Sequence, residues 1–183
     1  MSILACLILT LVGILVFTAY NIAVIAKFGI PSSLSASFYL WNSVRSKLGY
    51  IFTGMMFIMA FCLMPGWLEI TEVITPWSHY LTVLPFFGAA SIAFVGAAPA
   101  FRDCTLENKV HMVAAGCAAA FSLAWCASVC YQIAWYVLPA SLLLVWGIAL
   151  ATKTHKTGAT YWWEMVAFVA TFATIIIECC KLM

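Results

Sequence analysis

The chain has 183 residues, of which 66% are hydrophobic and only 8% are charged, and its mean hydropathy is +1.10. A water-soluble domain carries roughly a quarter charged residues, so this composition excludes a soluble protein. The formal net charge is only +2, and the basic residues are spread over three short segments, which argues against nucleic acid as a partner. The sequence therefore predicts an integral membrane protein.

Six apolar stretches follow one another along the chain. A crossing helix needs roughly 20 apolar residues, because the hydrocarbon core of a bilayer is about 30 Å thick and a helix rises about 1.5 Å per residue. We expect crossing helices at residues 3–26, 50–67, 80–100, 110–130, 133–151 and 161–180. The apolar runs are continuous, which argues against the alternating strands of a membrane barrel. The prediction is an all-α, polytopic bundle of six transmembrane helices, with residues 1–183 as one membrane domain.

The fourth and fifth spans are the least obvious pair, because only Tyr131 and Gln132 separate them. The apolar run from 110 to 151 is about twice as long as one crossing needs. Gln132, Trp135 and Pro139 are typical of a turn at the membrane surface. We therefore expect two helices here.

The basic residues orient the predicted bundle. Seven of the eight lie in odd-numbered loops and none in even-numbered loops; the seven are Lys27, Arg45, Lys47, Arg102, Lys109, Lys153 and Lys156. Short cytoplasmic loops carry an excess of Lys and Arg. This pattern predicts that loops one, three and five are cytoplasmic and that both termini are outside. The expected location is the cell membrane, which is the inner membrane in a bacterium.

Small residues recur at four-residue spacing in the third and fourth spans. The third span carries Ala89, Ala93 and Ala97, and the fourth carries the set Gly116, Ala120, Ala124 and Ser128. Helices in lipid associate where small residues let their backbones approach. We expect the third and fourth helices to pack along these stripes.

Ionisable residues within a membrane are functional candidates, because burying their charge is costly. The central parts of the first five spans contain none, whereas Glu164 lies about one turn into the sixth. Asp103, Glu107 and His111 follow one another at four-residue spacing and would share one face of a helix that begins early. Together with Glu164, these three are the candidate catalytic residues. The alternative is that the acids stabilise a helix N-terminus and the histidine lies at the interface.

The first long loop holds Pro31, Ser32 and Ser35, followed by an aromatic run. Such a segment lies along the membrane surface or dips into the bundle, and its serines cap a helix or form part of a polar site. His155, in the fifth loop, is expected on the same side of the membrane. Ser32, Ser35 and His155 are the candidate substrate-binding residues. The chain has no Cys-x-x-Cys pattern and no histidine close to a cysteine, so we expect no metal site and no cofactor.

A family resemblance rests on two short motifs. The end of the third span and the start of the fourth, with Val95, Gly96, Phe101 and His111, resemble the Frag1/DRAM group of membrane proteins, which includes the bacterial DUF998 proteins. A Pro- and Ser-rich motif follows the first span in that group, as Pro31, Ser32 and Ser35 do here. The resemblance implies six helices and a lipid-associated or membrane-trafficking role. Members of the group place the first loop outside the cytoplasm, whereas the basic residues here predict the opposite.

Three function classes remain open. The first is a membrane component without catalytic activity that binds membrane lipid, partner helices or a second copy of itself. The second is a lipid-modifying or lipid-hydrolysing enzyme that uses His111, Asp103, Glu107 and Glu164. The third is a small oligomeric transporter or channel. Convergence of the histidine and the acids in one pocket favours the enzyme, a continuous polar cavity favours the transporter, and a packed bundle favours the first.

Overall fold

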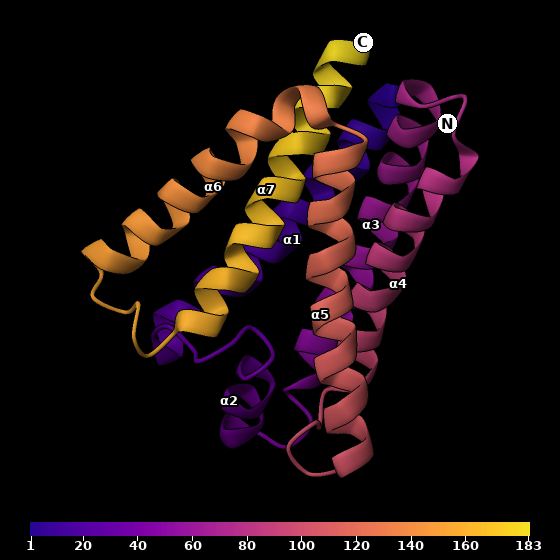
Figure 1. The fold of residues 1–183 in the computed structure, drawn as a ribbon. Coiled ribbons are helices and arrows are strands. Elements are labelled where there is room, and N and C mark those ends of the chain that lie inside the picture. Colours follow the sequence, from indigo (N-terminus) through magenta and orange to yellow (C-terminus); the bar gives the residue numbers. More distant parts are fainter.

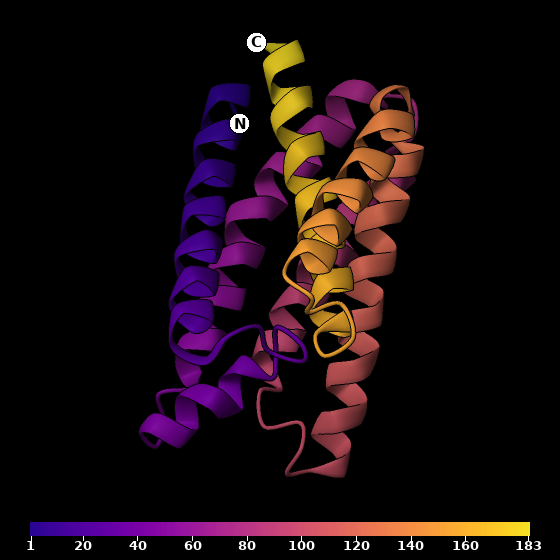
Figure 2. The same cartoon turned by 90° about the vertical axis from the view of Figure 1, so that its left-hand side faces the viewer.

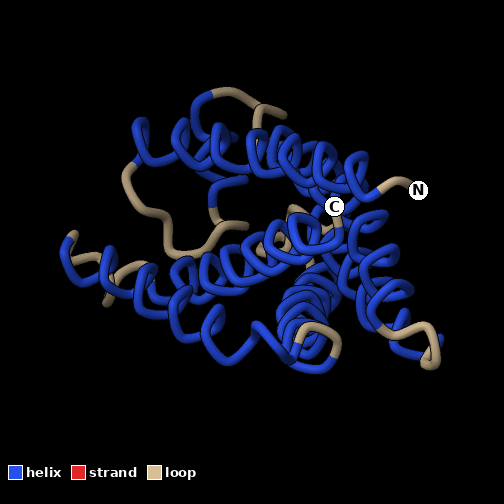
Figure 3. The backbone as a smooth tube through the Cα atoms, turned by 90° about the horizontal axis from the view of Figure 1, so that it is seen from above, coloured by secondary structure: helices blue, strands red, loops and turns tan.

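The computed structural model describes residues 1–183 and consists of helices joined by loops, without strands (Figure 3). The elements in chain order are α1 (Ile3–Phe28), α2 (Ser37–Val44), α3 (Tyr50–Ile74), η1 (His79–Thr82), α4 (Val83–Ala97), α5 (Thr105–Ser128), α6 (Tyr131–Ala151) and α7 (Ala159–Leu182). Six helices, with η1 and α4 counted as one, are long and apolar enough to cross a membrane. This confirms the prediction of an all-α, six-helix membrane protein.

The helix ends differ from the predicted spans at α3 and α5, where charged residues lie within the helices. α3 continues beyond Trp67 to Ile74, with Pro65 inside the helix. One reason is that the Glu69 carboxylate accepts a hydrogen bond from the amino group of Met1 at 2.7 Å. α5 begins at Thr105, ahead of the predicted start, with Glu107 in its first turn, where the helix dipole favours a negative charge.

The helices pack side by side, with α6 at the periphery. The most extensive helix pairs are α4 with α5, α3 with α4, and α1 with α3, whereas α6 packs mainly on α7. Figure 1 shows α6 and α5 meeting at their shared turn and diverging from there. That turn contains only Val129 and Cys130 between the two helices, which confirms that residues 110–151 form two crossings.

The two termini lie at the same end of the bundle (Figures 1 and 2). The opposite end holds α2 and the connections α1–α3, α4–α5 and α6–α7, as the same views show. These connections and the helix ends beside them carry the seven basic residues that oriented the predicted bundle. The positive charge is therefore gathered at the end away from the termini.

The small-residue stripe of α5 is not where α5 packs. The α4–α5 contact itself was predicted correctly, but Gly116, Ala120 and Ser128 are exposed, and a Cβ atom added at Gly116 would meet no atom within 4 Å. The face that turns inward carries His111, Ser122 and Trp125. The same inward face carries Ala114 and Ala118, which with Ser122 form a second small-residue stripe two positions away from the predicted one.

Small residues do bring α3 and α4 together. A Cβ atom added at Gly96 of α4 would lie 2.8 Å from the Met56 Cβ and 3.3 Å from the Thr53 carbonyl oxygen. Only glycine fits at this crossing, because any side chain would push the two backbones apart. A close approach at a small residue is therefore also found between α3 and α4.

Candidate functional site

An apolar cavity lies between α3, α4, α5 and α7. Twelve of its sixteen lining residues are hydrophobic. The lining comprises Leu34, Ser35, Phe52, Met56, Leu63, Trp67, Ile92, Val95, Ala115, Ala118, Ala119, Ser122, Glu164, Ala167, Phe168 and Thr171. Its volume is about 60 Å³. A single water needs roughly 10–15 Å³ by this measure, so the cavity accommodates a few waters or a short stretch of hydrocarbon chain.

The accessible side of the cavity lies between α5 and α7. Every lining residue from α3 and α4 is buried, whereas the half-buried members all come from α5 and α7. Those members are Ala115, Ala118, Ala119, Glu164, Ala167 and Phe168. Figure 1 shows α5 and α7 close together near the α5–α6 turn and farther apart toward α2. The cavity is therefore deepest against α3 and α4 and faces the surroundings between α5 and α7.

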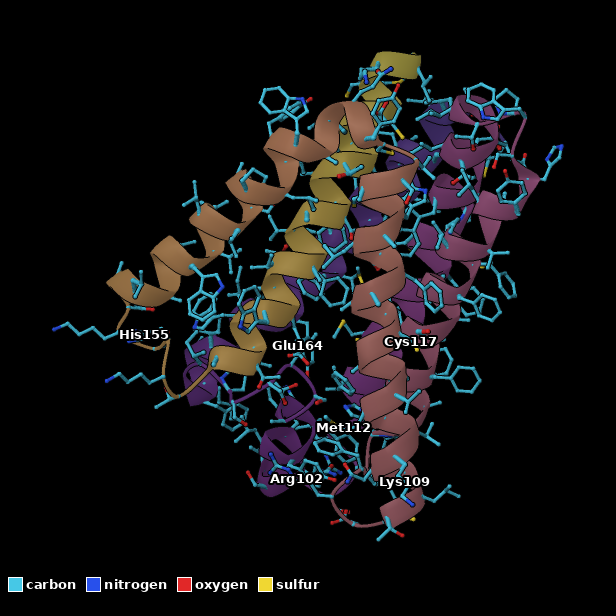
Figure 4. The ribbon with its side chains drawn as sticks, viewed as in Figure 1. Arg102, Lys109, Met112, Cys117, His155 and Glu164 are labelled. Carbon is cyan, nitrogen blue, oxygen red and sulfur yellow. The ribbon has the colours of Figure 1, made fainter.

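Glu164 is the only charged residue in the cavity lining. It lies in the second turn of α7, and in Figure 4 it is found between α7 and the chain that follows α1. Its Oε2 accepts a hydrogen bond from the Leu34 backbone N–H at 2.6 Å. No other hydrogen bond reaches this carboxylate, and neither of the two salt bridges of the structure involves it. The group therefore retains an oxygen without a partner and has no cationic neighbour to compensate its charge.

Residues 29–36, here named the closing segment, connect α1 to α2 and cover the cavity beside Glu164. Leu34 and Ser35 are buried and belong to the cavity lining. The Tyr161 N–H donates to the Ser32 carbonyl at 3.3 Å. A Cβ atom added at Gly158 would lie 2.9 Å from the Ile30 Cγ2. The segment is thus packed directly against the start of α7, and of the two alternatives for this loop the structure has the one that dips into the bundle.

A polar layer lies next to the closing segment. The Tyr20 and Ser37 hydroxyls are hydrogen-bonded, and the Ser37 hydroxyl also donates to the Leu34 carbonyl. The Tyr161 hydroxyl donates to the Asn21 Oδ1 at 2.9 Å. Sequence reasoning did not single out Asn21, although an amide within the apolar run of α1 was the available signal. These bonds hold α1, α2 and α7 together and fix the position of Leu34 relative to Glu164.

The two candidate serines of this loop have different surroundings. Ser35 is buried, and its Oγ lies 3.1 Å from the Ser33 Oγ. The Ser33 Oγ also accepts from the Ala36 N–H at 3.1 Å, just before α2. Ser32 is exposed and contributes only its backbone carbonyl to the bond from Tyr161. Of the two, only Ser35 reaches the cavity.

His111 shares no hydrogen bond with Glu164. It is buried, and its Nδ1 lies 3.1 Å from the Ala98 carbonyl oxygen. A carbonyl only accepts hydrogen bonds, so Nδ1 carries the hydrogen and donates it. The ring stacks on Phe101 at a centroid distance of 4.4 Å. Its contacts hold the α4–α5 connection against α5.

Tyr39 extends this aromatic contact to α2. Its ring lies edge-on to Phe101 at 5.5 Å, and the Arg102 guanidinium lies 4.8 Å above it. The Tyr39 hydroxyl accepts a hydrogen bond from the Arg102 N–H at 2.7 Å. Burial raises the pKa of this phenol above its ordinary value. The group of Tyr39, Phe101 and His111 therefore ties α2 to the α4–α5 connection.

The remaining candidate residues do not join Glu164 or His111. Asp103 precedes α5, so the helix does not begin early enough to include it, and Asp103 is exposed. Glu107 has a buried Oε2 without a hydrogen-bond partner, and His155 has a buried Nδ1 without one. Figure 4 shows His155 on the α6–α7 connection, well apart from Glu164. No hydrogen bond or salt bridge joins any two of these candidates, and no group of three His, Cys, Asp or Glu is arranged to hold a metal.

Replacing His111 with Ala is expected to lower the free energy of unfolding by about 1–3 kcal/mol, because the buried Ala98 carbonyl loses its side-chain partner. The matched control is Met112→Ala, since Met112 is the next residue of α5 and is 62% exposed. Unfolding in a detergent titration followed by circular dichroism measures both. A His111→Ala protein as stable as the Met112→Ala protein would contradict a structural role for the ring.

Comparison of the chain with protein-family models, with curated proteins and with solved structures found no match. The resemblance to the Frag1/DRAM group therefore stays a prediction.

Proposed function

We propose that this protein is a membrane component without catalytic activity that binds a lipid chain in the cavity between α3, α4, α5 and α7. The observation that carries the proposal is the predominantly hydrophobic lining, with its half-buried members on α5 and α7. A hydrocarbon chain entering from the bilayer would pass between these two helices. Ligand sites are typically concave and apolar with a few polar groups that fix orientation, and Glu164 and Ser35 would be those groups.

The other function classes have less support. An enzyme of the expected kind would use His111 together with Asp103, Glu107 and Glu164, and no hydrogen bond or salt bridge joins these groups. A transporter would be favoured by a continuous polar pathway, whereas this cavity is lined mainly by apolar side chains. We therefore retain lipid binding and propose membrane lipid as the partner.

We propose in addition that the end carrying α2 is cytoplasmic and that both termini are outside. The support is the gathering of the seven basic residues near the end of the bundle opposite the termini, as expected from the positive-inside bias. The proposed location is the cell membrane.

Filling the cavity should abolish lipid binding. Ala119 lines the cavity, whereas Ala120, the next residue of α5, is exposed and outside it. In lipid nanodiscs, a single-chain photoreactive lipid with a diazirine on its chain should label the wild-type protein and Ala120→Trp to the same extent. Ala119→Trp should lose most of this labelling, because its indole would occupy the space of the chain.

A smaller substitution provides a second test in case Ala119→Trp does not fold. Ala118→Leu adds a smaller side chain to the same wall and should reduce labelling in part, with unchanged helicity by circular dichroism. Equal labelling of the wild type, Ala118→Leu and Ala119→Trp, all folded, would overturn the proposal.

A further inference from the structure

The inference concerns the head group of the ligand and rests on the proposed function. The only charge in the cavity lining is the carboxylate of Glu164, and the hydroxyls in the lining come from Ser35, Ser122 and Thr171. The Ser122 hydroxyl already donates to the Ala118 carbonyl at 2.5 Å. The Trp67 Nε1 and the Thr171 hydroxyl are buried without a partner, so the cavity offers a ligand one charged acceptor and two neutral polar groups.

The protein does not neutralise this carboxylate. The two salt bridges of the structure join Met1 to Glu69 and Lys181 to Glu178, both near the end of the bundle that carries the termini. Glu164 lies in the second turn of α7, at the end of that helix away from the termini, and its single hydrogen bond comes from a neutral backbone N–H. A carboxylate taken out of water is costly unless it is paired. An intramembrane acid of this kind has a partner in most proteins.

Because the chain supplies no cation, a cationic partner for Glu164 has to come from outside the chain and reach the cavity. Glu164 is half-buried and belongs to the side of the lining shared by α5 and α7, where a molecule from the bilayer would enter. The carboxylate also lies beside the closing segment, in the second turn of α7 and at the height of Cys117 of α5 (Figure 4). A head group held here would lie beside the start of α7, and its hydrocarbon chain would extend into the apolar part of the cavity toward Trp67.

We propose that the cavity selects a single-chain amphiphile whose head group is a primary amine, with the ammonium bound to the free oxygen of Glu164. The ammonium donates a charge-assisted hydrogen bond and compensates the buried charge, and such bonds are roughly twice as strong as neutral ones. The Oε2 atom remains on the Leu34 N–H, so binding requires no movement of the closing segment. An alcohol of the same chain length fills the same space without neutralising the carboxylate, and a carboxylic acid places a second negative charge beside it.

Three probes with the same diazirine-bearing dodecyl chain test this selectivity, ending in an amine, an alcohol or a carboxylic acid. The protein is held in phosphatidylcholine nanodiscs, and labelling is measured as a function of probe concentration. The apparent affinity of the amine should exceed that of the alcohol by about tenfold or more. In Glu164→Gln the amine should fall to the level of the alcohol, and the alcohol itself should be unaffected.

Glu164→Gln keeps an oxygen that accepts from the Leu34 N–H, so the closing segment should stay in place. The matched control is Glu69→Gln, which removes one negative charge of α3 outside the cavity. This control should retain the preference for the amine. If it does not, the preference reflects the net charge of the protein and the inference fails.

Failure of the inference is distinguishable from failure of the proposed function. Equal labelling by amine and alcohol, preference for the acid, or an amine preference that survives in Glu164→Gln would each overturn the head-group assignment. In those cases labelling that Ala119→Trp still blocks would leave lipid binding in the cavity intact. If Ala119→Trp blocks none of the three probes, both proposals fall.

Discussion

Replacing Trp125 with Ala is expected to lower the free energy of unfolding by about 3–5 kcal/mol, the range for large aromatic side chains removed from a packed interior. Trp125 is fully buried, and its Nε1 donates to the Thr71 hydroxyl at 2.8 Å. Its ring lies edge-on to Trp67 at 5.8 Å. The substitution therefore removes contacts that join α5 to α3 and leaves a void behind one wall of the cavity.

Trp135→Ala is the matched control for this loss. Trp135 is 75% exposed on α6 and contacts little of the bundle interior. Its replacement should change the free energy of unfolding by less than about 1 kcal/mol, because exposed positions away from packing and buried polar contacts tolerate substitution. Comparable destabilisation by the two variants in a detergent titration would show that Trp125 does not anchor α5 in the way described.

An impermeant maleimide added to intact cells is expected to label Cys180 and to leave Cys104 unlabelled. Both cysteines are exposed, and they lie near opposite ends of the bundle, one in the last turns of α7 and the other just before α5. The proposed orientation places Cys180 outside and Cys104 in the cytoplasm. The expected difference is all or none, because the reagent reaches only one side of the membrane.

Two single serine variants identify which cysteine is labelled. Cys180→Ser should abolish labelling of intact cells, whereas Cys104→Ser should leave it unchanged. Five of the other cysteines are buried and should contribute little signal. After permeabilisation both exposed positions should react. Labelling of intact cells that depends on Cys104 and not on Cys180 would reverse the proposed orientation.

The number of helices was predictable because it depends on properties of the sequence itself. Apolar length fixes how many crossings are possible, and the run from 110 to 151 was too long for one. The short turn of Val129 and Cys130 is all that separates α5 from α6. The gathering of basic residues near one end of the bundle likewise follows from their positions along the chain.

The rotation of each helix about its axis was not predictable in the same way. The stripe containing Gly116 and Ala120 had the spacing of a packing face, yet it is exposed. On the inward face of α5, His111 and Trp125 donate to the Ala98 carbonyl and to the Thr71 hydroxyl. Such partners come from distant parts of the chain, and helical spacing alone contains no information about them.

The candidate site was predictable only in part for the same reason. Glu164 was recognised because an acid within a membrane span is unusual, but its neighbour is the backbone N–H of Leu34, 130 positions away in the sequence. The four-residue spacing of Glu107 and His111 suggested a shared site, whereas His111 packs on Phe101. The cavity itself arises from four helices and could not be read from any one of them.

Locating the adduct of the photoreactive lipid by peptide mass spectrometry tests the central claim most directly. Binding in the cavity predicts saturable adducts on buried lining residues such as Leu63 and Trp67, and loss of these adducts in Ala119→Trp. Adducts confined to outward-facing side chains such as Leu15 and Leu143, which are 69% and 74% exposed, would contradict it. In that case lipid would surround the outer surface of the protein as a solvent and would not enter the cavity.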